Sequence, residues 1–277
     1  MTNIPKKLHT YWNGSSMSEL QTFTLSSFHK YNPDWEINVY VPKQDARSSQ
    51  KYIPDYTGKD YFPSVKAVDY VNIKTIDLAD YNIDPELHDI LRSDIFRYNM
   101  LYNEGGVWSD FDVVWLKPMS HFKNIEYHGN VAYDDIRTVV SMSHGSHGAH
   151  SIGIMIHCKN DPYMASVIEL TKKVEPPYKH EVFGAKMIQR KYYNLETMSE
   201  FPGAVGVKLE TYYPYTLWPH RMNIHALYYS NNLGFINNNV MCVHWYNGHP
   251  YSKDYVNGDG FNSDCTMTTL LKQERYI

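Results

Sequence analysis

Residues 84–118 read DPELHDILRSDIFRYNMLYNEGGVWSDFDVVWLKP, and the rest of the chain is organised around this stretch. Its first half predicts a helix that starts at Asp84, which can cap the first turn. Pro85 then falls at the first helical position, where a missing N–H costs nothing. The glycine pair that begins at Gly105 predicts the end of the helix.

One face of this helix carries both apolar and charged residues. At 100° per residue a single stripe holds Leu87, Leu91, Asp94, Tyr98 and Leu101. Asp94 therefore falls on the face that should be buried, and an unpaired buried charge is costly. Arg97, one turn further on, can reach the same space. Two interpretations stay open at this point: an ion pair that only steadies the helix, or a pair that contacts a ligand.

Two carboxylates follow the helix and a short predicted strand over 107–109. Asp110 and Asp112 are alternate residues of a segment predicted to be extended, so both side chains should leave one face, about 6.6 Å apart at the backbone. Carboxylates that converge to ~4 Å repel by about 4 kcal/mol at an effective dielectric near 20. A positive partner is therefore expected, and oxygen ligands suit Mg²⁺ or Mn²⁺.

The segment RSDIFRYNMLYNEGGVWSDFD (92–112) resembles the signature of the DXD glycosyltransferases of family 32, which are related to the clostridial toxin glucosyltransferases. The resemblance implies a GT-A fold, a nucleoside diphosphate sugar as donor, a divalent metal, Mn²⁺ or Mg²⁺, and retention of the anomeric configuration. It is specific over 4–14, over 92–112 and around His244.

The beginning of the chain predicts a βαβ unit. A strand is expected over 7–11, a helix over 18–31 and a second strand over 36–41, which is typical of a Rossmann-like nucleotide-binding fold. The segment IPKKLHTYWNG (4–14) resembles the opening motif of the same family, whose Trp stacks on the nucleotide base. Trp12 follows a strand, where open parallel sheets bind ligands. Its alternative interpretation is a ring that caps the core.

Towards the end of the chain, an apolar strand is predicted over 240–245. The resemblance implies that His244 is a metal ligand, and a buried structural histidine is the alternative. It leaves His249 and Lys253 as weak candidates for phosphate contacts. Residues 253–277 are polar, and a lid or a tail is expected there.

The remaining segments carry less chemistry. Further strands are expected over 130–133, 138–143 and 152–158, and helices over 161–174 and 181–191, whereas 43–83 suggest a helical excursion or an acceptor-side insertion. Three histidines recur at every third position in the loop 144–150. A loop fixes no ligand geometry, so a polar loop beside the acceptor is preferred there to a metal site.

Composition limits the protein class. The 277 residues suffice for one α/β domain, and a net charge of −4 without a basic run argues against nucleic acid as a partner. No apolar run reaches transmembrane length, and the first residues lack a signal-peptide pattern. The three cysteines lack metal-ligand spacing and are expected as reduced thiols. A cytoplasmic enzyme is the expectation.

The sequence thus predicts a single α/β domain over 1–277, with a GT-A-like mixed and mostly parallel sheet. The expected activity moves a hexosyl group from a nucleoside diphosphate sugar, UDP-hexose before GDP-mannose, to a hydroxyl of a glycan or another acceptor. Asp112 and His244 would hold the metal, together with Asp110, which would also contact the ribose or sugar. Asp94 and Arg97 would bind the donor sugar. A nucleotide-sugar hydrolase and a carbohydrate-binding module with a structural cation are the alternatives.

Overall fold

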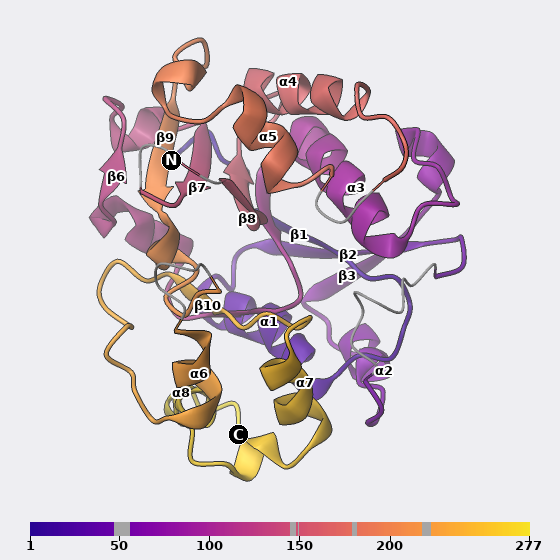
Figure 1. The fold of residues 1–277 in the computed structure, drawn as a ribbon, viewed down its shortest axis with the longest axis vertical. Helices are drawn as coiled ribbons and strands as arrows, with labels where there is room; N and C mark the ends of the chain where they lie inside the picture. Colours follow the sequence, from indigo (N-terminus) through magenta and orange to yellow (C-terminus); the bar gives the residue numbers. More distant parts are fainter. Residues whose placement is uncertain (47–55, 145–147, 149, 179–181, 218–222) are drawn as a thin grey trace.

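A computed structural model describes residues 1–277 apart from 47–55, 145–147, 149, 179–181 and 218–222 (Figure 1). Within the described part of the chain, no helix is both long and apolar enough to cross a bilayer. All three cysteines are free and buried, as expected for reduced thiols.

The predicted βαβ unit is confirmed. Strand β1 (Lys7–Tyr11) leads into helix α1 (Glu19–Tyr31) and back to β2 (Glu36–Pro42), which pairs with β1 in parallel. The side chain of Ser18 accepts a hydrogen bond from the backbone N–H of Gln21, and Gln21 binds back to the Ser18 amide. This capping box fixes where α1 begins.

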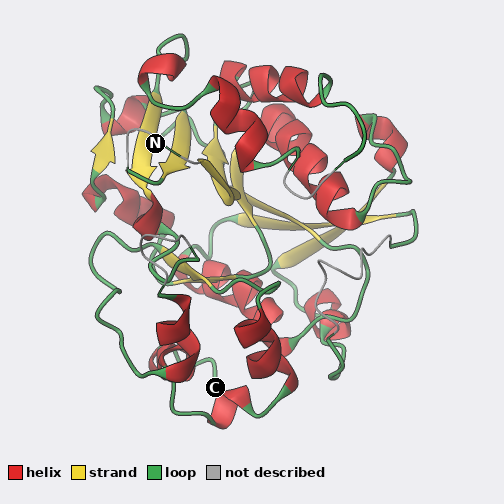
Figure 2. Cartoon of the chain, viewed as in Figure 1, coloured by secondary structure: helices red, strands yellow, loops and turns green. Residues whose placement is uncertain are grey.

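An eight-stranded sheet forms the centre of the fold (Figure 2). The strand order is β3-β2-β1-β4-β8-β7-β9-β6. Besides β1 and β2, the sheet contains β3 (Val71–Ile76), β4 (Gly106–Ser109), β6 (Tyr127–His128), β7 (Thr138–Met142), β8 (His150–His157) and β9 (Ala204–Lys208). Four of its seven described pairings are parallel. The α/β class with a mixed, mostly parallel sheet is therefore confirmed.

A separate two-stranded ribbon carries the end of the chain back to the centre. Strand β10 (Cys242–His244) pairs antiparallel with β5 (Val113–Trp115), so residues 127 to 131 positions apart in sequence become neighbours. Helix α1 lies along β5 and hydrogen-bonds it through side chains: Thr24 binds Val113, and Ser27 accepts from Trp115.

The helices divide between two sides of the molecule (Figure 1). On one side α3 (Asp89–Glu104) packs against α4 (Pro162–Thr171), which also contacts α5 (Ala185–Lys191). On the other side lie α2 (Phe62–Lys66), α6 (Ile224–Tyr229), α7 (Pro250–Asn257) and α8 (Thr266–Gln273). Residues 253–277 thus include part of α7 and all of α8, whose apolar face packs on a buried cluster with α6.

Three sequence predictions were wrong in detail. Helix α3 starts at Asp89 and not at Asp84, because the Asp84 side chain accepts from the amide of Glu86 in a turn and Arg92 binds the carbonyl of Asp45. Residues 130–133 form no strand, since Gly129, with φ +125°, ends β6 before them. The region 43–83 holds strand β3, which the sequence did not predict.

Candidate active site

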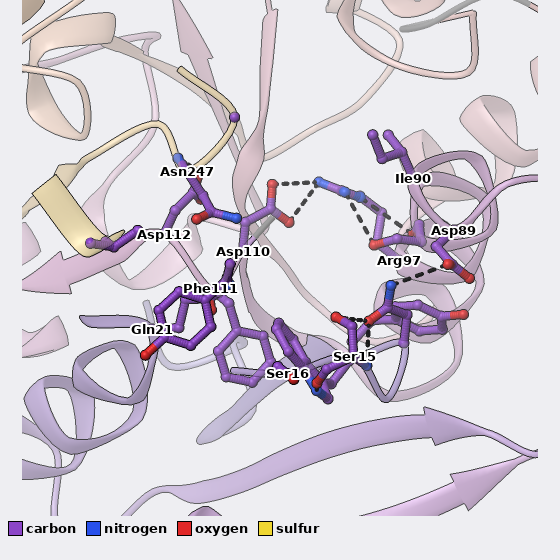
Figure 3. Close-up of a pocket in the computed structure, with 17 residues that line it drawn as sticks. Ser15, Ser16, Gln21, Asp89, Ile90, Arg97, Asp110, Phe111, Asp112 and Asn247 are labelled. Carbon is purple, nitrogen blue, oxygen red and sulfur yellow. Dashed lines mark hydrogen bonds and ion pairs between the residues drawn. The ribbon is translucent and has the colours of Figure 1, made fainter. Parts of the chain in front are cut away.

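A cavity of about 350 Å³ opens where the central parallel strands end (Figure 3). Trp12 directly follows β1 and Asp110 directly follows β4, and these two strands are parallel neighbours. Both side chains therefore reach the same edge of the sheet. The cavity is lined mainly by the segment after β1, by the first turns of α3 and by the turn after β4, with residues that include Tyr11, Trp12, Asn13, Asp89, Ser93, Arg97, Asp110, Phe111 and Asp112.

Asp110, Asp112 and His244 converge at one end of this cavity. One ligand atom from each of the three lies within 4.8 Å of the others. The two carboxylates do not meet on an extended strand as expected, because residues 111–112 form a turn between β4 and β5. Pairing of β10 with β5 places His244 opposite Val113, beside Asp112, and completes the group.

Each carboxylate has its own counter-group. Asp110 lies 3.2 Å from the Arg97 guanidinium and accepts a 2.8 Å hydrogen bond from the Trp108 indole. Asp112 lies 3.0 Å from His244 Nε2 and accepts a 2.9 Å hydrogen bond from the backbone amide of Asn247. The repulsion expected between two converging carboxylates is therefore offset by separate partners.

The pKa values of the two carboxyl groups shift in opposite directions. Burial raises the pKa of Asp110 above its ordinary value, Arg97 opposes this rise, and the charge of Asp112 adds to it. Burial would also raise the pKa of Asp112, but His244 and the Asn247 amide bring that pKa below its ordinary value. Asp112 is thus the more firmly ionised of the two, which suits a ligand for a cation.

The orientation of His244 follows from its backbone contacts. Its Nδ1 accepts a 3.3 Å hydrogen bond from the amide of Tyr246, which places the proton of a neutral ring on Nε2, facing Asp112. A cation held at Nε2 would have to replace that proton. The same ring can therefore donate a hydrogen bond to Asp112, or bind a cation through Nε2 with its proton moved to Nδ1 at the expense of the Tyr246 contact.

The predicted pair Asp94–Arg97 is formed, at 2.9 Å, with both side chains buried. Arg97 also donates to the carbonyl of Ile152 at 2.5 Å and lines the cavity, whereas Asp94 is absent from the described lining. The structure therefore brings Arg97 to the site directly, within reach of Asp110 (Figure 3). Asp94 reaches the site only through its ion pair with Arg97.

Trp12 lines the cavity but is only 7% exposed. Its ring packs edge-on against Phe111 at 5.1 Å, and its indole donates to the carbonyl of Ser15 at 3.0 Å. Trp12 is thus packed in the core beside the cavity, and its predicted role in binding the base stays a prediction.

Sequence reasoning missed a second buried pair at the cavity wall. Asp89 and Arg92 lie 2.9 Å apart, and the other Asp89 oxygen accepts from Asn13 at 3.1 Å. Asn13 in turn accepts from Ser15, so this pair fixes the loop that carries Trp12. The sequence signal for this pair was Asp89, the acidic residue in the first turn of α3. It was not recognised because the helix was predicted to start at Asp84.

The weaker candidates lie apart from the carboxylate cluster in the described residues. His249 caps α7, its Nδ1 accepting from the amide of Tyr251, and Lys253 lies in the same helix. In the loop 144–150, positions 145–147 and 149 fall outside the described residues, so the predicted role of that loop is undecided. His150 begins β8 and is buried.

Comparison with known proteins finds a family that part of this chain resembles. The family described as "glycosyltransferase sugar-binding region containing DXD motif" matches residues 18–132. Over 118 residues the chain is 28% identical to "Subversion of eukaryotic traffic protein A" of Legionella pneumophila subsp. pneumophila (strain Philadelphia 1). That match covers 42% of this chain and only 18% of the Legionella protein.

Solved structures with a similar chain path include the PaToxG glycosyltransferase, at 19% identity and a TM-score of 0.42, with 68% of this chain and 69% of that chain covered. Another is the galactosyltransferase LgtC in complex with donor and acceptor sugar analogs, at 13% identity and a TM-score of 0.40, with 89% and 93% covered.

The family match includes Asp94, Arg97, Asp110 and Asp112, and it leaves Trp12 and His244 outside. The resemblance to DXD-motif glycosyltransferases is confirmed, whereas membership of family 32 stays a prediction. Residues 18–132 of this chain thus resemble the glycosyltransferase sugar-binding region that contains the DXD motif.

Proposed function

We propose that this chain transfers a hexosyl group from a nucleoside diphosphate sugar to a hydroxyl group, with retention of configuration. The observation that carries the proposal is the convergence of Asp110, Asp112 and His244 within 4.8 Å. The two carboxylates line a cavity that Arg97 and Trp12 also line. A cavity of about 350 Å³ falls within the range of small-molecule sites, roughly 300–1,000 Å³.

The residues present fit a divalent cation. Two carboxylates and an imidazole are donors suited to Mn²⁺ or Mg²⁺, and Asp112 Oδ1 is buried with only the His244 ring beside it. When bound, such a cation would neutralise the diphosphate and stabilise it as a leaving group. Asp112 and His244 are proposed as ligands, with Asp110 completing the set.

The other residues have roles that follow from charge and position. Arg97 supplies a buried positive charge at the cavity wall, suited to the donor sugar or its diphosphate, and Asp94 holds Arg97 in place. Trp12 is proposed to carry the base. Asp110, held by Arg97 and Trp108, is proposed to contact the ribose or the sugar.

The finer assignments rest on the family resemblance. UDP-hexose is the first choice of donor and GDP-mannose the second. No carboxylate is assigned as a nucleophile, so attack of the acceptor on the donor's own face, assisted by the leaving phosphate, is proposed. We further propose one domain over 1–277 and a cytoplasmic site of action. Because the name of the Legionella relative refers to eukaryotic traffic, the acceptors tested should include eukaryotic proteins as well as sugars.

The first experiment tests metal-dependent chemistry at Asp112. We expect Asp112→Asn to lower Mn²⁺-dependent release of nucleoside diphosphate by at least about a hundredfold, since even an outer partner of a ligand is worth 10–100-fold. Removing one of two neighbouring negative charges should leave the thermal midpoint of the metal-free protein unchanged or slightly higher.

Asp135→Asn is the matched control, because Asp135 is an exposed carboxylate of a short helix away from the cavity. Full donor cleavage by Asp112→Asn would overturn the metal assignment. Product analysis with and without acceptors separates transfer from hydrolysis. Absence of any metal-dependent cleavage by the wild type, with sugar binding retained, would favour a binding module.

A further inference from the structure

Gly153 lies in the interior of β8, at the back of the carboxylate cluster. Its carbonyl accepts a 2.8 Å hydrogen bond from the amide of Asp110. A glycine is unfavourable inside a strand and often marks the close approach of a ligand. Gly153 is not among the described glycines with a positive φ, so its backbone conformation does not require glycine. The reason for this residue must therefore be space.

The space in front of Gly153 is bounded by polar atoms. A Cβ placed there would stand 2.7 Å from the Tyr213 hydroxyl, 3.1 Å from Asp110 Oδ2 and 3.4 Å from His244 Nε2. Two of these three atoms belong to the group that could hold a cation. Any side chain at position 153 would thus enter the region between Asp110 and His244.

Tyr213 forms the other side of this space. The residue is buried, and its ring centroid lies 4.8 Å from that of His244. Its hydroxyl oxygen accepts a hydrogen bond from the Ser151 hydroxyl, which leaves the phenol's own proton for another acceptor. A phenol, whose ordinary pKa is about 10, keeps that proton at neutral pH.

We propose that Gly153 and Tyr213 are positioning residues of the donor site. Gly153 keeps open the space that the cation and an anionic oxygen need between Asp110 and His244. Tyr213 donates a hydrogen bond to an oxygen of the nucleoside diphosphate in that space. The inference rests on the proposed function, because it takes a nucleoside diphosphate as the ligand.

The test begins with Mn²⁺ alone, titrated into the full chain by calorimetry. Gly153→Ala should bind Mn²⁺ at least tenfold more weakly than the wild type. Ile156→Val is the control, because it alters a buried residue of the same strand that belongs to the apolar core, and it should bind Mn²⁺ like the wild type. Wild-type Mn²⁺ affinity in a folded Gly153→Ala protein overturns the inference.

A double variant tests whether Gly153 leaves space for a ligand or only accommodates the Tyr213 side chain. Tyr213→Phe removes the hydroxyl that the new methyl group would meet most closely, so Gly153→Ala/Tyr213→Phe should fold even where the single alanine variant does not. We expect it to stay deficient in Mn²⁺ binding. Recovery of wild-type affinity would show that glycine only accommodates the phenol, and would overturn the inference.

Tyr213→Phe alone tests the proposed hydrogen bond. It should bind Mn²⁺ like the wild type but bind UDP in the presence of Mn²⁺ about tenfold more weakly, as for the loss of one hydrogen bond to a charged group. Unchanged UDP affinity would remove Tyr213 from the site.

Cleavage of UDP-sugars by the wild type, measured separately, tells the two failures apart. If the wild type cleaves donors while Gly153→Ala binds Mn²⁺ normally, only the present inference fails. If Gly153→Ala loses Mn²⁺ but no nucleotide sugar is cleaved or bound by the wild type, the proposed function fails and the role of Gly153 in keeping the cation space stands.

Discussion

Arg97 is the residue at which helix α3 and the turn that carries Asp110 and Asp112 meet. Its guanidinium lies 2.9 Å from Asp94, 3.2 Å from Asp110 and 2.5 Å from the Ile152 carbonyl, and it stands over the Trp108 ring. A buried guanidinium with several acceptors is held in one orientation. The sequence predicted the pair with Asp94 from helical spacing, but the contact with Asp110 depends on how the sheet folds.

This shared guanidinium decides what Asp94→Asn should do. Arg97 keeps Asp110 and the Ile152 carbonyl as partners, so the variant should lose less than the 3–5 kcal/mol typical of a broken buried pair. We expect about 1 kcal/mol of lost stability and a roughly tenfold slower transfer, because a charged hydrogen bond that orients Arg97 is weakened. Denaturant melts and initial rates measure the two effects.

Asp84→Asn is the control for this variant, since exposed Asp84 only caps a turn and asparagine caps equally well. If Asp94→Asn melts several kcal/mol below the wild type yet transfers sugar at the normal rate, Asp94 is purely structural.

Trp12 should affect nucleotide affinity and stability together. Trp12→Ala removes a ring that packs on Phe111, so a loss of stability is expected whatever its function. If the ring also carries the base, UDP affinity should fall by about 1–3 kcal/mol while Mn²⁺ affinity stays unchanged. Calorimetry with each ligand gives both values.

Trp35→Ala provides the comparison, because Trp35 packs edge-on against Phe28 and lies outside the described lining of the donor cavity. It should lower stability without changing UDP affinity. Equal UDP affinity in Trp12→Ala and the wild type would assign Trp12 to the core alone.

Among the elements, β5 shows how a helix can take the place of a neighbouring strand. Thr24 of α1 donates to the Val113 carbonyl at 2.7 Å and accepts from the Val113 amide at 3.3 Å, and Ser27 accepts from the Trp115 amide. Hydroxyl groups on α1 thereby satisfy backbone groups of a strand whose other edge pairs with β10.

Thr24→Val should therefore destabilise the protein although it keeps the shape of the side chain. It leaves two buried backbone groups of Val113 without partners, which costs about 1–3 kcal/mol. Ser26→Ala, on the same helix, removes only a weak 3.5 Å contact with the Thr22 carbonyl and should change little. Urea unfolding compares the two; similar stabilities would show that β5 does not depend on α1 for its hydrogen bonds.

Elements with local signals were predicted well, and those that depend on distant partners were not. The capping box at Ser18 and the glycines after α3 fixed α1, β4 and the end of α3. The start of α3 was misplaced because Asp84 and Pro85 have the residue types of a helix start, while the carbonyl of Asp45, about 40 residues earlier, binds Arg92 and favours a loop. Strand β3 was missed because it lies at the edge of the sheet, and because its two end residues are buried while most residues between them are exposed.

The same distinction holds for the candidate site. Asp94, Arg97, Asp110 and Asp112 lie within one short stretch, so spacing and resemblance could identify them. The contribution of Gly153 and Tyr213 could not be read from spacing, because their closeness to Asp110 arises from the pairing of β8 with β4 and from tertiary packing.

At the scale of the whole molecule, two buried histidines are expected to contribute to the response to acid. His9 is enclosed between the Tyr40 hydroxyl and the Gly105 carbonyl, each at 2.9 Å, and burial lowers its pKa to about 4. Burial likewise lowers the pKa of His150 to about 4. Both rings are therefore neutral in the folded protein at pH values where an unfolded chain would bind protons.

The stability from these neutral rings is fully present above the ordinary histidine pKa of 6.5, and is lost as pH falls from there towards about 4. From pH 7 to pH 5, each should contribute a loss of about 2 kcal/mol in the free energy of unfolding. His9→Gln keeps a hydrogen-bond donor and an acceptor but cannot titrate. From pH 7 to pH 5, the free energy of unfolding of this variant should therefore fall by about 2 kcal/mol less than that of the wild type. Parallel pH profiles for the variant and the wild type would contradict this.

The pairing of β10 with β5 has a consequence for the protein while it is still being made. Asp110 and Asp112 leave the ribosome more than 130 residues before His244, and the strand that carries His244 needs β5 already in place. A nascent chain of 200 residues would expose both carboxylates but lack the imidazole that completes their group. In the proposed site, His244 is therefore the last of the three groups to be synthesised, and the order of the strands delays assembly of the group until β10 has been made.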